Sequence, residues 1–417
     1  MQRLFRQPQD EKEGDAMRIG IVTTWLERGA SYVSRSYMKA LEQKHDVFIY
    51  ARGGETYAKK DPVWNLPNVT WAQRCRGLNV DRRDFKNWID GNHIDAVLFN
   101  EQQDWRIVVY AKKELPQLLV GAYVDYYNEA TIPWFSLYDF VICNTKRHMQ
   151  AMSDHPQAIY IPWGTDVNLF RPSQGKQNSQ LSFFHSAGMS ERKGTELLLD
   201  AFIKNGLGEK SKLIVHSQLP IRWATSLNDR QLEANNIQII QKTVSAPGLY
   251  ELGDVYVYPT RLDGLGLTMY EALACGLPVI ATDYPPMNEV IDETVGRLVK
   301  VERNYARADA YYWPMSVCDP DDLAEKMLWY IEDTDRVRAQ QKNARERALE
   351  RHDWTKQYDK VCTTFECASV RDADDRLVRE IEAHYRKENL KLLFGWAYQF
   401  VRDNPALARL VKSVKNG

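Results

Sequence analysis

Short apolar runs alternate with amphipathic helical patterns along most of this chain, and this alternation restricts its fold more than any other feature. The first run, Arg18–Trp25 (RIGIVTTW), predicts a buried strand, and Ser31–Lys44 predicts the helix that follows it. Further strands are expected at 45–51, 94–101, 117–124, 139–145 and 158–162, and further helices at 84–91, 105–115 and 146–153. Such alternation is typical of right-handed βαβ units, in which helices cover both faces of a parallel sheet.

The alternation stops at a polar stretch, Arg171–Gln180 (RPSQGKQNSQ), and then begins again. Expected strands in this second part are 181–186, 212–217, 237–242, 254–259, 278–283 and 296–301, and expected helices are 195–205, 268–274 and 321–333. A restart after a linker predicts two doubly wound α/β domains, 17–172 and 173–352, instead of one large sheet. Ligands of such domains bind beyond the carboxyl ends of the strands, so we expect the functional site in the cleft between them.

The two ends of the chain carry different patterns. Residues 1–16 are polar and have no apolar segment of the secretory type, so a flexible leader is expected there. Residues 353–417 predict C-terminal helices, the first of them packing back on the N-terminal domain. Within this tail, Asn389–Gly417 is apolar on one face and has five basic residues against one acid. A peripheral membrane helix and a helix packed on its own protein both fit that pattern.

Composition excludes several classes of protein. The 55 Lys and Arg residues nearly balance 56 Asp and Glu, so no overall charge favours nucleic acid as a partner. Six cysteines lie at no metal-ligand spacing and predict free thiols in a reducing compartment, which indicates a cytoplasmic protein. The sequence contains no run of 18 uncharged apolar residues, so no membrane-spanning helix is expected.

The segment Asp254–Ile291 (DVYVYPTRLDGLGLTMYEALACGLPVIATDYPPMNEVI) gives the strongest functional signal. It predicts a strand, then a glycine-containing loop, then a helix that begins near Thr268. Gly264 and Gly266 permit close backbone approach and positive φ angles. The N–H groups at the start of the helix would then be free, and such a helix end binds phosphate.

Two acids bracket this loop. Asp263 lies in the loop, where it can reach a sugar hydroxyl, and Glu271 lies about one turn into the helix, where it can accept hydrogen bonds from ribose hydroxyls. The plainer alternative is a helix cap and an exposed helical acid.

The stretch DGLGLTMYEALACGLPVIA resembles the donor motif of glycosyltransferase family 4, in which an acid, seven residues and a glutamate follow one another. Three other segments resemble motifs of that family: WLERGASYVSRSYMKAL after the first strand, IPWGTDVNLFRP (Ile161–Pro172) and RKGTELLLDAF (Arg192–Phe202). Together they cover about Met17–Asp359. The resemblance implies the GT-B fold, an α/β architecture of two facing Rossmann-like domains with a cleft between them and a helical C-terminal tail.

The resemblance also implies a retaining glycosyltransferase of the hexosyltransferase type that acts in polysaccharide biosynthesis. The donor would be a nucleotide-diphosphate sugar, with UDP or GDP as the leading candidates and the base left open among uridine, guanosine and adenosine. The acceptor would be a glycan, a lipid-linked glycan or a small molecule, and no metal or other cofactor would be required. Lys193 would neutralise the diphosphate, Glu271 would bind the ribose, and Asp263 would lie beside the donor sugar. The implied donor-binding residues are Glu271, Lys193, Arg192, Gly264, Leu265, Gly266, Leu267 and Thr268. The loop at Gly29 and Ala30 would let the acceptor or phosphate approach closely.

Four positions depart from the family pattern. Asp263 stands where glutamate is usual, and Gly188 stands where arginine is common, so that Arg192 is the candidate replacement. Pro285-Pro286 replaces a glycine pair and removes two N–H donors. The stretch GAYVDYY lacks the family's histidine and offers only Asp125, a candidate catalytic residue that could hold a donor hydroxyl or the acceptor.

Aromatic residues suit the faces of sugar rings, and the N-terminal domain is rich in tryptophan. Most of these residues are expected in the core, and one or two are expected as acceptor platforms. They are Trp25, Trp64, Trp71, Trp88, Trp105, Trp134 and Trp163.

Two other classes of protein share such a fold. A nucleotide-sugar epimerase should show paired acid and base residues at the cleft and lack the donor motif. An inactive nucleotide-binding homologue should have lost donor residues, and Gly188 is the one position that favours it.

Overall fold

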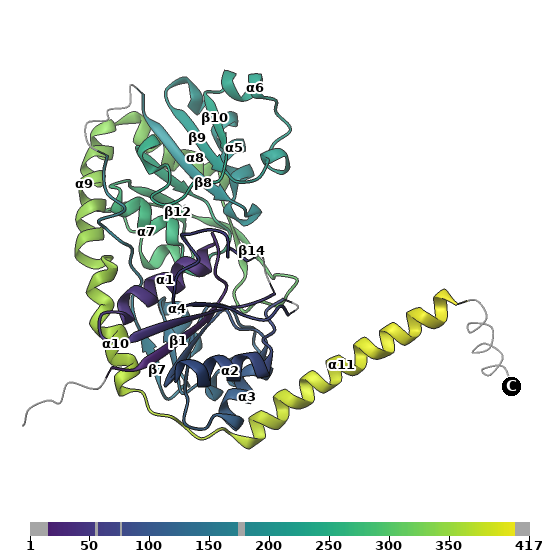
Figure 1. Ribbon diagram of the computed structural model, residues 1–417. Coiled ribbons are helices and arrows are strands. Elements are labelled where there is room, and N and C mark those ends of the chain that lie inside the picture. Colours follow the sequence, from purple (N-terminus) through teal and green to yellow (C-terminus); the bar gives the residue numbers. More distant parts are fainter. Residues whose placement is uncertain (1–15, 55–56, 76, 174–179, 405–417) are drawn as a thin grey trace, which may run out of the picture.

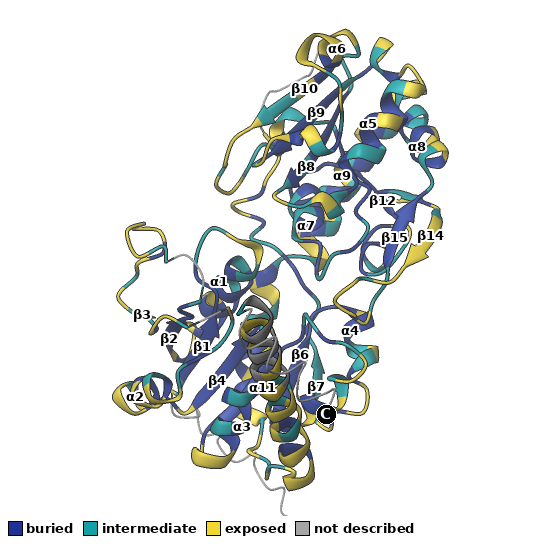
Figure 2. Cartoon of the chain, turned by 90° about the vertical axis from the view of Figure 1, so that its right-hand side faces the viewer, coloured by how far each residue is buried: buried dark blue, intermediate teal, exposed yellow. Residues whose placement is uncertain are grey.

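The computed structural model describes residues 16–54, 57–75, 77–173 and 180–404 as two α/β lobes that face each other (Figure 1). Most of the expected leader, residues 1–15, and the tail beyond residue 404 lie outside the described residues. The central strands of both sheets are buried, as Figure 2 shows in dark blue, whereas the edge strands are only partly covered. Ile19 and Ile21 of the first strand pack in one apolar cluster and Val22 in another, because successive side chains point to opposite faces of the sheet. The predicted layers, with both faces of a parallel sheet covered, are confirmed.

The N-terminal sheet has seven parallel strands in the order β3-β2-β1-β4-β5-β6-β7. They are β1 (Arg18–Thr23), β2 (Asp46–Ala51), β3 (Val69–Trp71), β4 (Ala96–Asn100), β5 (Leu119–Tyr123), β6 (Phe140–Cys143) and β7 (Ala158–Tyr160). Its helices are α1 (Gly29–Leu41), α2 (Arg82–Asn92), α3 (Trp105–Glu114), α4 (Lys146–Ala151) and the 3-10 helix η1 (Ile132–Leu137). In the register, Ile19 lies opposite both Val47 and Ala96, which places β1 between β2 and β4.

The C-terminal sheet has six parallel strands in the order β10-β9-β8-β11-β12-β13. They are β8 (Ser182–Gly188), β9 (Lys212–Ser217), β10 (Ile237–Gln241), β11 (Val255–Tyr258), β12 (Val279–Thr282) and β13 (Gly296–Val299). Its helices are α5 (Thr195–Lys204), α6 (Asp229–Ala234), α7 (Leu267–Ala274) and α8 (Pro320–Glu332). Short 3-10 turns are η2 (Glu191–Lys193), η3 (Leu207–Glu209), η4 (Ile221–Trp223), η5 (Tyr250–Leu252) and η6 (Met287–Glu289).

Every expected strand and helix of the two lobes is present, and four short elements were not expected. These are β3, α6 and an antiparallel hairpin of β14 (Val301–Tyr305) and β15 (Met315–Cys318). Four of the five residues of β14 are exposed, so this strand has no apolar alternation that would predict it.

The chain crosses back to the N-terminal lobe after α9 (Thr334–Arg351). It continues through η7 (Trp354–Gln357) into α10 (Tyr358–Cys367), which packs on α1. The Trp354 indole donates to the carbonyl of Ser36 at 2.9 Å, and the Phe365 and Phe140 rings lie 5.0 Å apart. Both lobes are therefore covered by one continuous run of helices (Figure 1).

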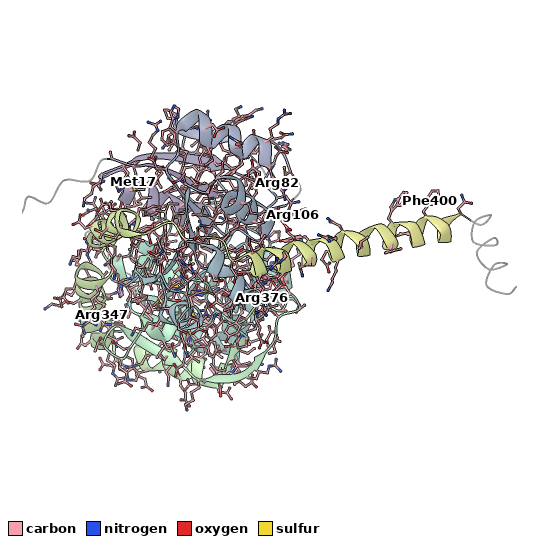
Figure 3. All side chains as sticks on the ribbon, turned by 90° about the horizontal axis from the view of Figure 1, so that it is seen from below. Met17, Arg82, Arg106, Arg347, Arg376 and Phe400 are labelled. Carbon is pink, nitrogen blue, oxygen red and sulfur yellow. The ribbon has the colours of Figure 1, made fainter. Side chains whose placement is uncertain are left out.

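The last described helix is α11 (Asp375–Asp403), and only its first part contacts the lobes. Leu377, Val378 and Ile381 are buried against the N-terminal lobe. Beyond Tyr385 the helix extends away from the body, and Phe400 lies near its far end (Figures 1 and 3). No helix among the described residues is long and apolar enough to cross a membrane.

Candidate functional site

The first turn of α7 lies between two cavities at the cleft between the lobes. The Glu271 cavity, of about 550 Å³, is lined by Glu271 and by residues of both lobes. The Asp263 cavity, of about 830 Å³, is lined by Asp263 and again by residues of both lobes. Leu267 and Thr268 line both cavities, so one extended ligand can reach from one cavity to the other past the start of α7.

The Asp263 cavity brings together most of the residues that the sequence singled out. It is lined by Gly29, Ala30, Asp125, Arg192, Lys193, Asp263, Gly264, Leu265, Leu267 and Thr268. Glu271 lines the other cavity, and Gly266 is buried and lines neither.

The loop before α7 has the backbone conformation that its glycines predict. Gly266 is the N-cap residue with φ +76° and ψ +45°, a left-handed conformation that costs glycine little because it has no Cβ atom. No side chain caps this helix. The N–H groups of the first turn, at Leu267 and Thr268, are therefore available to an anion.

Gly264 lies close to Asp125 of the N-terminal lobe. A Cβ atom at position 264 would lie 2.1 Å from Oδ1 of Asp125, which is too close for any real contact. A glycine is thus needed here for close approach between lobes, as the sequence predicts for this loop.

Lys193 and Asp263 form an ion pair at the wall of the cavity, and both side chains are largely buried. The ammonium of Lys193 also donates to the hydroxyl of Tyr258 at 2.8 Å, and that hydroxyl donates to Asp263. Burial alone would raise the pKa of Asp263, but the charges of Lys193 and Arg192 outweigh it and lower the pKa to about 2. The acid is therefore ionised, and the cation is held at the start of α7.

Arg192 and Lys193 face the same cavity although they are adjacent in the chain. They lie in the 3-10 turn η2, where Ser190 accepts hydrogen bonds from both the backbone N–H and the Nε of Arg192. The structure thus places two cations at the Asp263 cavity, whereas Gly188 lines the Glu271 cavity.

Glu271 is held by Tyr250 on the floor of the other cavity. The Tyr250 hydroxyl donates to Oε2 of Glu271 at 2.5 Å. Burial raises the pKa of Glu271 to about 7, although the Tyr250 hydrogen bond and the charge of Lys193 oppose this rise. A ligand whose hydroxyl groups donate hydrogen bonds to the ionised Glu271 carboxylate stabilises that ionised form.

Asp125 is paired with a second carboxyl that the sequence analysis missed. Burial, and then the negative charge of Glu101 and a hydrogen bond with it, raise the pKa of Asp125 to about 8. Glu101 follows β4 with a φ angle of +51°, which is uncommon for a residue other than glycine. Its position at the carboxyl end of the expected strand 94–101 was the available signal.

Gly29 is the first residue of α1 and lies opposite Leu267. A Cβ atom at position 29 would meet Leu267 at 3.6 Å, an ordinary contact distance. The protein alone therefore does not require a glycine at this position.

Arg147 and Glu289 join the two lobes beside the site, and sequence analysis missed both roles. The Glu289 carboxylate accepts from the backbone N–H groups of Lys146 and Arg147, at 2.6 and 3.0 Å. The Arg147 guanidinium donates to the carbonyls of Pro285, at 2.7 Å, and Asp263. The proline pair, expected only to remove N–H donors, thus supplies an acceptor.

Most of the tryptophans of the N-terminal lobe are in the core, as expected. Trp25, Trp64, Trp88, Trp105, Trp134 and Trp163 are at most 4% exposed. None of the seven tryptophans lines the Asp263 cavity, whose aromatic residues are Tyr123, Tyr126 and Tyr311. The tryptophans fill the space between sheet and helices, and Trp163 also lines the Glu271 cavity.

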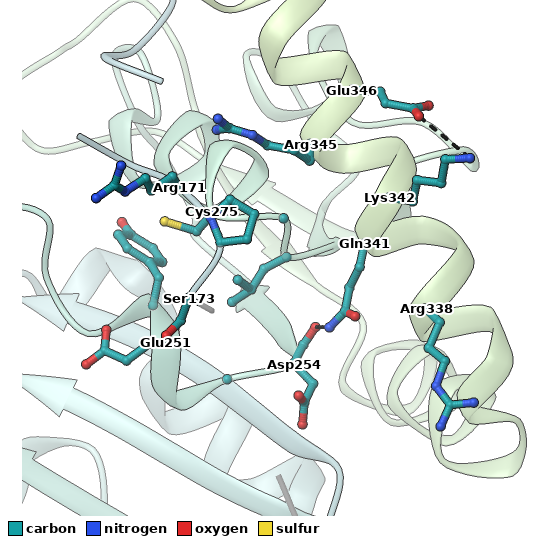
Figure 4. A pocket seen from close by; sticks show the side chains of 15 residues that line it. Arg171, Ser173, Glu251, Asp254, Cys275, Arg338, Gln341, Lys342, Arg345 and Glu346 are labelled. Atoms are coloured by element: carbon teal, nitrogen blue, oxygen red, sulfur yellow. Dashed lines mark hydrogen bonds and ion pairs between the residues drawn. The ribbon is translucent and has the colours of Figure 1, made fainter. Parts of the chain in front are cut away.

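A further cavity, of about 530 Å³, lies between α9 and the end of α7 (Figure 4). Its charged side chains take part in packing: Lys342 pairs with Glu346 at 3.8 Å, and Arg345 donates to three backbone carbonyls. None of the predicted site residues lines it. The candidate site is therefore the pair of cavities in the cleft.

The chain is similar in sequence to known proteins. Residues 166–347, which include α7 and η2, match the family model of glycosyl transferases group 1. The GtfA subunit of a UDP-N-acetylglucosamine–peptide N-acetylglucosaminyltransferase of Streptococcus pneumoniae is 24% identical over 284 residues, 60% of this chain and 52% of that protein. A GDP-mannose-dependent alpha-(1-6)-phosphatidylinositol dimannoside mannosyltransferase of Mycobacterium tuberculosis is 22% identical over 225 residues, 51% and 58% of the two chains. The chain thus spans about half the length of these curated relatives.

A solved glycosyltransferase from Rickettsia africae has the same arrangement of lobes. Its TM-score is 0.66 at 16% identity, over 85% of this chain and 100% of that one. At this identity the likeness concerns the fold. The chain has the GT-B fold, two facing Rossmann-like domains with a helical C-terminal region, and its residues 166–347 are similar to the group 1 glycosyl transferases.

Proposed function

We propose that this chain is a retaining glycosyltransferase that moves a hexose from a nucleotide-diphosphate sugar to a carbohydrate or glycolipid acceptor. One observation supports the proposal above all others. The uncapped start of α7 lines both cavities, with the cations Arg192 and Lys193 in one of them and the carboxyl of Glu271 in the other.

The donor would lie across the start of α7. Its diphosphate would accept from the N–H groups of Leu267 and Thr268 and face Lys193 and Arg192. Its ribose hydroxyls would donate to Glu271, which directs the nucleoside into the Glu271 cavity. Its sugar would then occupy the Asp263 cavity. Uridine and guanosine are the proposed bases, since the two curated relatives carry UDP and GDP donors in their names.

The reaction would break the bond between the sugar C1 atom and the diphosphate oxygen. The acceptor oxygen would form its bond to C1 on the same face, and its proton would pass to the departing phosphate oxygen. Negative charge grows on the diphosphate as the bond breaks, so helix N–H groups and a fixed ammonium stabilise the transition state more than the bound donor. These groups would supply the charge stabilisation without a metal cofactor.

A thermal-shift series tests donor binding. UDP-glucose, UDP-N-acetylglucosamine and GDP-mannose are added to the wild type, Lys193→Ala and Glu271→Ala. We expect at least one donor to raise the wild-type melting temperature, because a ligand that binds only the folded state stabilises it. Both variants should lose the shift. Lys204→Ala and Glu233→Ala, which change exposed helical residues of the same lobe, should keep it. No shift with any donor would contradict the proposal.

Product analysis separates the alternatives. A glycosyltransferase releases nucleoside diphosphate at a rate that rises with acceptor. An epimerase of this fold would change the sugar without acceptor-dependent release. An inactive homologue would bind the donor and do neither.

The outer part of α11 is proposed as a contact with an anionic lipid surface at the inner face of the membrane. Leu390, Phe394, Trp396 and Phe400 are 46%, 72%, 68% and 52% exposed, and the chain nearby is rich in lysine and arginine. Exposed aromatic residues beside basic ones suit the lipid interface. The basic residues Arg409, Lys412 and Lys415 lie outside the described residues.

Flotation with phosphatidylglycerol vesicles tests this contact. The wild type should bind them, and a variant with Phe394→Ser, Trp396→Ser and Phe400→Ser should not. Equal vesicle binding by the wild type and the variant would contradict a lipid surface as the partner of α11. A concentration-dependent dimer of the wild type that the variant does not form would contradict it as well.

A further inference from the structure

The β14–β15 hairpin reaches from the C-terminal lobe to the segment that follows β5. Its connecting loop, residues 306–314, makes several hydrogen bonds there. Tyr311 donates to the carbonyl of Asp125 at 3.0 Å, and the backbone N–H of Tyr312 donates to the carbonyl of Tyr127 at 2.9 Å. The Trp313 indole donates to the Tyr127 hydroxyl at 2.7 Å. The loop is thus fixed across the cleft by both its backbone and its side chains.

The loop gives the Asp263 cavity an aromatic wall shared by both lobes. The rings of Tyr126 and Tyr311 lie 5.2 Å apart and are nearly parallel, at 17°. The Tyr126 hydroxyl donates to the carbonyl of Asp309 at 3.2 Å. All three residues line the cavity, together with Arg307. Aromatic rings of this kind bind the apolar faces of sugars and have a polar group for their hydroxyls.

Charged groups around this wall are balanced in pairs. Arg307 donates to Asp309 at 2.9 Å, and Lys193 is paired with Asp263. An uncharged ring with hydroxyl groups suits the wall beside Arg307 and Asp309 better than a charged one, because it leaves that pair intact.

Two carboxyls lie at the other side of the same cavity. Glu101 and Asp125 both line it and form a hydrogen-bonded pair. The left-handed backbone of Glu101 costs free energy, and such strain is concentrated at functional sites. A carboxyl pair both donates to and accepts from hydroxyl groups.

We propose that loop 306–314 completes an acceptor subsite for an uncharged hexopyranoside. The sugar ring packs against Tyr126, which Tyr311 supports by stacking on it, and the sugar hydroxyls bind to Glu101 and Asp125. The inference rests on the proposed function, since the donor sugar at Asp263 would lie in the same cavity. The hairpin would then select the acceptor and would not be needed for donor binding.

Saturation-transfer NMR tests the subsite with methyl α-D-mannopyranoside, methyl α-D-glucopyranoside and methyl α-D-galactopyranoside. Each is added at millimolar concentration to the full chain with UDP or GDP present. We expect transfer to the ring protons of at least one glycoside in the wild type. Tyr126→Leu and Tyr311→Leu should each reduce that transfer at least fivefold. Tyr311→Phe keeps the ring and should retain it.

The control is Tyr305→Leu, which removes an exposed tyrosine of the same hairpin outside the cavity. It should leave glycoside transfer unchanged. Donor thermal shifts, measured on every variant, show whether each is folded and whether the proposed function stands. Two results would overturn the subsite alone, provided that the donor shifts are normal. One is the absence of saturation transfer to any glycoside, and the other is saturation transfer that Tyr126→Leu and Tyr311→Leu leave unchanged. A wild type without any donor shift would overturn the proposed function instead.

Discussion

The carboxyl group of Asp125 lies so close to the backbone of Gly264 that a Cβ atom at position 264 would be 2.1 Å from the Oδ1 atom of Asp125. Asp125 follows β5 of the N-terminal lobe, and Gly264 belongs to the loop before α7 of the C-terminal lobe. This contact joins the two lobes at the proposed place of sugar transfer. It also makes the geometry of the site sensitive to one methyl group.

Gly264→Ala should destabilise the protein by about 1–3 kcal/mol, the usual cost of an extra group in a packed contact. The loss should be smaller when Asp125→Ala is also present, because the clash then disappears. Urea unfolding of the single and double variants measures this coupling. Gly91→Ala, where an added Cβ would meet open space on α2, is the matched control and should cost nothing. Additive losses at 264 and 125 would argue against the contact.

Asp125 should make stability fall with rising pH. The pKa of Asp125 is about 8 in the folded protein, against its usual value of 3.8 in the unfolded chain. As the pH rises, the unfolded chain therefore loses this proton first. Folding is therefore progressively disfavoured between about pH 4 and pH 8. Asp125→Asn imitates the protonated acid and should gain stability relative to the wild type across that range. Denaturant unfolding at several values between pH 5 and pH 9 checks the sign, and a pH-independent difference would refute it.

Donor binding should strengthen as the pH rises through about 7. Glu271 has a pKa of about 7 in the unliganded protein, and its ionised form is the better acceptor for ribose hydroxyls. Below this pH the affinity should fall by up to about tenfold per pH unit. Titration calorimetry with the preferred nucleotide sugar between pH 6 and pH 8.5 measures the slope. Glu271→Gln should bind more weakly and should flatten it, whereas an equal slope would assign the titration to another group.

Lys112 should be essential for the stability of the N-terminal lobe. Its ammonium is 2.6 Å from Asp139 and donates to the carbonyl of Arg371 at 2.7 Å, and both charged side chains are at most 3% exposed. Lys112→Met leaves the Asp139 carboxylate buried without its cation, which should cost about 3–5 kcal/mol. The neighbouring Lys113→Met removes an exposed ion pair and should change stability by about 0.5 kcal/mol or less. Denaturant unfolding compares the two, and similar losses would contradict this role.

Local sequence patterns were sufficient for most of the fold. Apolar runs such as that of β1 and the glycine loop before α7 predict their own structure, since periodicity and backbone freedom act over a few residues. Strand β14 was missed because its exposed residues show no such periodicity. The same limit applies to α6, which has six residues.

The candidate site was predictable only in part, for the same reason. The sequence placed Lys193, Asp263 and Glu271 in one region because they belong to recognisable local motifs of one lobe. It did not show that Glu101 pairs with Asp125, or that the loop at Tyr311 crosses the cleft.

The sequence by itself thus determined two parallel α/β domains and the glycine-capped start of α7 between them. Only the tertiary structure decided which side chains of the opposite lobe face that helix, from Asp125 at Gly264 to Glu289 at α4. The physical reason is range. Backbone conformation responds to neighbouring residues, whereas contacts across the cleft join residues more than a hundred positions apart and arise only once both lobes have folded and docked.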